Sequence, residues 1–294
     1  MVYFGPTQNT INGESSWITN SIFRENAFFY HGSRSGIDGD IDLSQCSRRV
    51  DFGRGFHLNT SDIQAKTWVI DQFNPYVYTF TINFKALDDS KILYLSETEW
   101  AYTVLHNRKN CPEFTGSGLD QAVSNMTYGY DFIIGPIADD RLRNAVRAFG
   151  NNALTDEGLI ACLSKIDYGT QIVAKTKKAI DCLEIINVQD SFGEQEQEML
   201  EQYKRNQISQ ARNTVREIQV AYQHKGRLID SILQDDSEVK RIEELTKKAE
   251  ILVFQHENGC SSGQIVNLKD VLSNITEHNG SYSINATRTD DLCI

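Results

Sequence analysis

The sequence predicts an α+β fold, with a mixed β-sheet domain over residues 27–188 and a helical region over residues 189–294. The first observation is a series of short apolar segments, separated by glycine and proline turns and mixed with helical patterns without regular βαβ alternation. The second is a change of character from Glu194, where Glu, Gln, Lys and Arg dominate and glycine nearly vanishes. Residues 1–26 are polar and predict an N-terminal arm.

Strands are predicted from aromatic content and from alternation. Aromatic residues that end at Gly32 predict a strand over 27–31, and clean alternation predicts the longest strand, over 76–84. Between these two, residues 34–50 are rich in Gly, Asp and Ser and predict a loop. Further short strands are predicted at 56–58, 92–95, 130–134, 171–174 and 183–186.

Helices are predicted from capping residues and from apolar spacing. Thr60 or Ser61 is a suitable N-cap for a helix over 61–73, and Ser96 with Glu99 forms a capping-box pattern for a helix through Arg108. Two more helices are predicted to begin at Asp139 and at Thr155. In the C-terminal region a break at 224–226 separates two long helical patterns, which predicts an antiparallel helical hairpin; a short helix is expected at 268–275.

The bulk composition excludes several classes of protein. A net charge of −11 argues against tight non-specific binding to nucleic acid, although Arg48, Arg49 and Arg54 leave a local basic patch open. No apolar run approaches the ~20 residues of a membrane span, and no signal peptide is evident, so a cytoplasmic location is predicted. The six cysteines lack zinc-ligand spacing, so free thiols and no metal site are expected.

Two histidine-containing segments carry the strongest chemical signal. His31 ends an aromatic strand and is followed by Gly32, where the absence of a Cβ lets a ligand approach the backbone closely. The second segment is Gly53-Arg54-Gly55-Phe56-His57, a glycine-bracketed turn that opens into another strand. Either histidine alone is compatible with a structural role, so function depends on whether the two segments form one site.

The order and spacing of these segments resemble the ADP-ribosyltransferase family of the diphtheria-toxin and poly(ADP-ribose) polymerase type. In that family a strand carries His-Gly, and a later Gly-x-Gly-aromatic-Tyr segment leads into a helix with a second aromatic residue eleven positions on. Here residues 30–33 match the first part, residues 53–57 the second, and Trp68 stands eleven residues after His57. Together with residues 130–140 and 171–173, the pattern looks similar to a poorly characterised bacterial branch, over about residues 27–188.

The resemblance implies a split-sheet domain that binds NAD. His31 would hydrogen-bond the adenosine ribose, and the Gly32 backbone would hold the nicotinamide carboxamide. His57 and Trp68 would enclose the nicotinamide ring by stacking. The remaining cofactor contacts that the resemblance implies are Ser33, Phe56 and, at the pyrophosphate, Arg48, Arg49 or Arg54.

Two positions depart from the family pattern. His57 stands where the family has tyrosine; it can still stack but is expected to titrate near neutral pH, and a His/His pair also resembles the RNA 2′-phosphotransferase branch. Gln171 best matches the third catalytic position, usually a glutamate. Glutamine can hydrogen-bond a ribose hydroxyl but cannot act as a general base, so chain elongation to poly(ADP-ribose) is not expected.

The resemblance therefore implies a mono-ADP-ribosyltransferase that cleaves NAD and passes ADP-ribose to a macromolecule, a protein rather than a nucleic acid. Small bacterial enzymes of this type often serve as toxins or phage-defence effectors. One alternative is a catalytically inactive module that binds NAD or ADP-ribose. Another is an NAD-dependent nucleic-acid-modifying transferase. In each case the C-terminal helices are expected to contact a partner, a substrate or a second copy of the chain.

Overall fold

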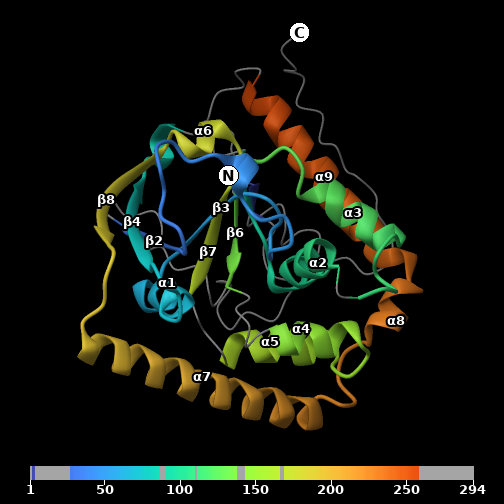
Figure 1. The fold of residues 1–294 in the computed structure, drawn as a ribbon. Helices are drawn as coiled ribbons and strands as arrows, with labels where there is room; N and C mark the ends of the chain where they lie inside the picture. The colour runs from blue at the N-terminus through green and yellow to red at the C-terminus, as the bar shows by residue number, and fades with distance from the viewer. Residues whose placement is uncertain are drawn as a thin grey trace. The chain divides into compact units, whose positions relative to one another are not determined.

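A computed structural model describes residues 2–3, 27–86, 91–109, 111–137, 143–165 and 169–257 (Figure 1). The predicted helix start at Asp139, the helix at 268–275 and nearly all of the N-terminal arm lie outside these residues. The described part belongs to one compact unit, residues 1–259. It is a mixed α+β structure, as the sequence predicts.

A single sheet of eight strands runs through the unit in the order β1-β5-β6-β7-β3-β2-β4-β8. The strands are β1 (Val2–Tyr3), β2 (Phe29–Ser33), β3 (Phe56–Asn59), β4 (Tyr76–Ile82), β5 (Ile92–Tyr94), β6 (Phe132–Pro136), β7 (Thr170–Ala174) and β8 (Leu183–Gln189). β1, β5 and β6 pair in parallel, whereas every other pairing is antiparallel. Central strands are therefore brought together from distant parts of the chain.

Helices pack on the sheet and on one another. They are α1 (Asp62–Val69), α2 (Glu97–Arg108), α3 (Gly118–Met126), α4 (Arg143–Gly150), α5 (Asp156–Lys165), α6 (Lys177–Ile180), α7 (Glu194–Ala221), α8 (Ile229–Leu233) and α9 (Asp236–Glu257). Ser96 caps α2 by accepting a hydrogen bond from the Glu99 amide, as predicted. The sequence analysis did not assign α3, although Ser117 caps it and its apolar residues are buried at helical spacing.

Alternation along the strands divides the core between the two faces of the sheet. On one face Phe29, Phe56 and Ile172 form a cluster that is covered by α6 and by residues 37–46. On the other face a larger cluster joins Phe52 and Val173 to α2, α3, α4 and α5. Helix α1 covers the latter face where β2 and β4 pair.

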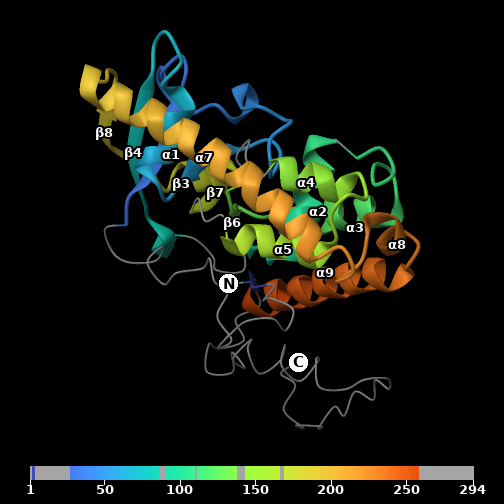
Figure 2. The ribbon, with the colours of Figure 1, turned by 90° about the horizontal axis from the view of Figure 1, so that it is seen from below.

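The two long C-terminal helices form, but they do not fold back on each other as the predicted antiparallel hairpin. α7 packs against α1, α4 and α5, whereas α9 packs against α3 and α8 (Figures 1 and 2). The reason is that the apolar stripe of α7, which includes Leu200, Val215 and Ile218, is buried against the rest of the unit. No helix in the described ranges is both long enough and apolar enough to cross a membrane.

Candidate functional site

The sheet opens between β2 and β3, at the segments that the sequence singles out. These strands pair at Tyr30 and Asn59, and no further pair follows along them. β2 nevertheless stays paired with β4 through Ser33, and β3 stays paired with β7 back to Phe56. The opening is therefore lined by residues 31–33 on one side and residues 56–58 on the other. Along these two edges no β2–β3 ladder uses the backbone N–H and C=O groups, so these groups can form hydrogen bonds with a ligand.

His31 bridges this opening. Its Nδ1 donates a hydrogen bond to the His57 carbonyl oxygen at 2.7 Å, and its ring lies 4.3 Å from the ring of Phe56. Burial lowers the pKa of His31, so the imidazole is neutral at neutral pH. Because the Nδ1 proton is committed to the carbonyl, Nε2 carries the free lone pair. Phe56 itself is buried and supports His31 from the core.

His57 is also neutral, which differs from the expected titration near neutral pH. Burial lowers the pKa of His57 to about 4, and the charge of Lys175 acts in the same direction. In the neutral ring Nε2 donates to the Gly53 carbonyl at 3.2 Å, which leaves the lone pair on Nδ1. His57 can thus stack on a ligand or accept a hydrogen bond without carrying charge.

Gly32 allows helix α1 to approach β2 closely. A Cβ at this position would lie 2.6 Å from the Ala65 carbonyl oxygen and 3.4 Å from Cδ1 of Trp68. Trp68 is half exposed, and the Arg34 guanidinium lies over its ring at 5.4 Å. Among the described residues the rings of His57 and Trp68 make no contact with each other. Since Arg34 already lies over one face of the Trp68 ring, a nicotinamide ring between His57 and Trp68 would have to displace Arg34 or stack on the opposite face of Trp68. The Ser33 hydroxyl donates to the Gly36 carbonyl.

Gln171 comes to the same site from β7. It is paired with Asn59 on β3, and alternation places it on the face of the sheet that carries His57. Gln171 lies close enough to affect the pKa of His57, yet its buried Oε1 has no hydrogen-bond partner in the described part of the chain. A buried acceptor without a partner is costly, which favours a bound group or water at this position.

Arg54, between the two glycines of the turn before β3, lies close enough to the loop that follows β2 for its charge to reach Asp42. Hydrogen bonds from Ser44 lower the pKa of Asp42, and the charge of Arg54 adds to this effect. The buried Nε of Arg54 has no hydrogen-bond partner within the described ranges. The structure therefore places Arg54 beside the opening, with one donor available.

Three residues that the sequence patterns did not indicate hold the turn before β3. Asn107 Nδ2 donates to the Asp51 carbonyl at 3.3 Å, and Lys175 Nζ donates to the Phe52 carbonyl at 2.6 Å. Arg108 pairs with the Asp51 carboxylate at 2.5 Å. Strand alternation could have indicated Lys175. Positions 171, 173 and 175 point to the same face of the sheet, and this is the face that carries His57.

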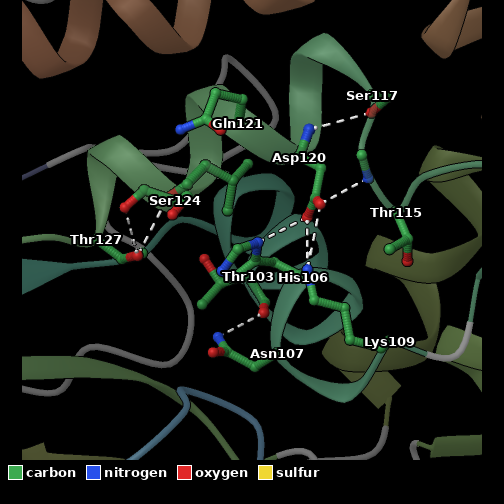
Figure 3. A network of polar contacts seen from close by, with 12 residues as sticks. Thr103, His106, Asn107, Lys109, Thr115, Ser117, Asp120, Gln121, Ser124 and Thr127 are labelled. Carbon is green, nitrogen blue, oxygen red and sulfur yellow. Dashed lines mark hydrogen bonds and ion pairs between the residues drawn. The ribbon is translucent and has the colours of Figure 1, made fainter.

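A second polar cluster, away from the opening, joins α2 to α3 (Figure 3). The Asp120 carboxylate accepts hydrogen bonds from His106 at 2.6 Å, from Lys109 at 3.2 Å and from the Gly116 amide at 2.8 Å. Burial of Asp120 opposes ionisation, but these three donors outweigh it and lower its pKa. Both carboxylate oxygens are satisfied, so this cluster is structural. Among the described residues no group of three or more His, Cys, Asp or Glu side chains could hold a metal ion.

A family model described as "Protein of unknown function (DUF3990)" matches residues 28–185. The match covers more than half of the chain, and the chain belongs to this family. It includes every candidate site residue, from His31 to Gln171. No curated protein and no solved structure matches the chain.

Proposed function

We propose that this chain is an NAD-dependent mono-ADP-ribosyltransferase with an ADP-ribosyltransferase-like split sheet, acting in the cytoplasm. It would cleave NAD, release nicotinamide and transfer ADP-ribose to a macromolecule, a protein rather than a nucleic acid. The observation that carries the proposal is the opening between β2 and β3, which brings His31, Gly32 and His57 to one place. Gln171, from a third strand, lies next to His57 there.

The charge state of the site suits NAD. The nicotinamide ring of NAD is a flat cation, and a neutral His57 can stack on it without repulsion. Trp68 already holds a planar cation, the Arg34 guanidinium, on its ring. The free acceptor of Gln171 and the free donor of Arg54 are polar groups that a ribose hydroxyl and a pyrophosphate would satisfy.

Cleavage of the nicotinamide–ribose bond at this site would depend on how the site orients the nicotinamide ribose. An oxocarbenium-like transition state is reached by holding the nicotinamide ribose in a reactive conformation, which needs no strong base. Gln171 would accept a hydrogen bond from a ribose hydroxyl and could not deprotonate an acceptor. The enzyme would therefore modify an acceptor once rather than elongate a chain.

Gln171 also supports the second candidate, a module that binds NAD or ADP-ribose without catalysis. The two candidates would use the same site between β2 and β3, and they differ in whether bound NAD is turned over. The decisive experiment measures nicotinamide release from NAD and transfer of labelled ADP-ribose, with and without cell lysate. We expect release and label in protein, and we expect His31→Ala and Gln171→Ala to reduce both.

Matched control variants are available at two exposed residues between α7 and α8. His224→Ala and Gln223→Ala remove the same side chains on the exposed break between α7 and α8, and both should leave activity unchanged. NAD binding without release would establish the binding module and exclude the transferase. Label in RNase-sensitive material would instead identify a nucleic-acid acceptor, and the absence of both binding and release would refute the proposal.

A further inference from the structure

The turn that precedes β3 is fixed by side chains from three different elements. Asn107 on α2 binds the carbonyl of residue 51, Lys175 after β7 binds the carbonyl of Phe52, and His57 on β3 binds the carbonyl of Gly53. Three consecutive carbonyls are therefore taken by three side-chain donors. The orientation of the His57 ring depends on where this turn is held.

Lys175 lies directly under the turn. A Cβ at Gly55 would lie 3.2 Å from Cδ of Lys175, and a Cβ at Gly53 would lie 3.6 Å from its Nζ. Gly53 also has a φ of +70°, which favours glycine. At Gly55 the lysine stem borders the turn together with Val173 Cγ1, 2.5 Å from such a Cβ, and the Ala174 carbonyl oxygen at 2.8 Å, whereas at Gly53 the nearest atom is Oδ1 of Asn107. Lys175 and Asn107 therefore both pack against the two glycines of this turn.

The ammonium group of Lys175 has no carboxylate partner within the described ranges. Burial lowers the pKa of Lys175 to about 8, which still leaves the amine mostly protonated at pH 7. The neighbouring carboxylate, Asp51, is paired with Arg108 instead. The other groups that face His57 are His31, which is neutral, and Gln171, which carries no charge. Lys175 is therefore the charged group that acts on His57 within the described residues.

We propose that Lys175 is a positioning residue that holds the turn before β3, and with it the His57 ring with its proton on Nε2, directed at the Gly53 carbonyl. It acts through the Phe52 carbonyl, which fixes the turn and hence the Gly53 acceptor that holds the Nε2 proton. Its charge also disfavours protonation of His57, in addition to the larger effect of burial on the His57 pKa. The link to NAD rests on the proposed function, because a neutral His57 is what a cationic nicotinamide requires. The positioning of His57 itself requires no NAD.

The test is a pH titration of the His57 ring followed by nitrogen NMR. Wild-type protein should show the Nε2–H form and a midpoint near pH 4. Lys175→Met keeps the stem but removes the donor and the charge. It should move the midpoint toward the ordinary value of 6.5 and should mix the two tautomers. Lys175→Arg should retain the wild-type behaviour in part. The matched control is Lys247→Met on α9, where the lysine side chain is exposed, and this variant should change nothing.

A folded Lys175→Met protein with an unchanged His57 midpoint and tautomer would overturn the proposal. If that variant does not fold, the wild-type protein supplies the test. The His57 and Gly53 resonances should show a second inflection near pH 8, where Lys175 loses its charge. A flat response through that range would also overturn the proposal. Since these measurements contain no NAD, their failure is distinguishable from a failure to release nicotinamide.

Discussion

Replacing Gly32 by alanine tests whether this glycine serves helix packing or ligand approach. The added Cβ would lie 2.6 Å from the Ala65 carbonyl oxygen and 3.0 Å from Cγ1 of Val69. Restoring an ordinary contact with that oxygen requires a shift of about 0.8 Å. The atom belongs to the backbone of α1, so rotation of a side chain cannot relieve the contact.

Helix α1 is not free to move by that amount. Lys66 pairs with Glu196 of α7 at 3.0 Å, and Asp71 pairs with Lys204 of α7. Overpacking of a well-packed position costs about 1–3 kcal/mol. We expect Gly32→Ala to lower the free energy of unfolding by an amount in this range, measured by urea denaturation.

The matched control is Gly193→Ala. No atom lies within 4 Å of a Cβ at Gly193, and its φ of −67° suits alanine. This variant should stay within about 0.5 kcal/mol of wild type. If Gly32→Ala is equally neutral yet abolishes NAD binding, the packing argument is wrong and the glycine serves the ligand.

Three further predictions concern the core, the catalytic position and pH. Arg241→Met should reduce the free energy of unfolding in urea by about 3–5 kcal/mol, because Glu99, 1% exposed and paired with Arg241 at 2.5 Å, would be left uncompensated; an unchanged urea midpoint would contradict this. Gln171→Glu should raise ADP-ribose transfer by about 10²-fold or more if Gln171 occupies the glutamate position, since a carboxylate adds a general base; no increase in a folded variant that still binds NAD would count against that role. Stability should fall as pH drops from about 6.5 to 4, because unfolded His57 takes up a proton that folded His57 resists, and the loss from this group is about 3 kcal/mol at most. In urea titrations His57→Asn should show a shallower dependence over the same pH range, and identical slopes would refute the assignment.

Most of the secondary structure, apart from α3, could be predicted from local patterns, but the pairing of strands could not. Alternation over residues 76–84 predicts β4, and Ser96 predicts the start of α2. The opening between β2 and β3 arises because β2 continues along β4 while β3 continues along β7, and these are contacts between distant segments. No local pattern encodes which neighbour a strand follows.

The prediction of an antiparallel hairpin between the two C-terminal helices was wrong for a related reason. The apolar stripe on α7, with Ala211 and Val215, would look the same in the sequence whether it faced α9 or α5. An amphipathic pattern indicates that one face is buried but does not indicate the partner. The sequence therefore predicted the long helices correctly and misassigned the surface that covers them.

The protonation states of the site histidines could not be predicted from the sequence either. These states limit which group could accept ADP-ribose. A histidine in place of tyrosine suggests a group that titrates near neutral pH, but burial and Lys175 keep His57 neutral. His31 is neutral too, and Gln171 cannot ionise. These three residues supply hydrogen bonds and stacking; the lowered pKa values make both histidines weaker bases than an ordinary imidazole, and Gln171 is not a base. A transferase built on them would need an acceptor that is nucleophilic without deprotonation, such as the carboxylate of an aspartate or glutamate side chain. Hydroxyl acceptors would require a base from the acceptor protein itself.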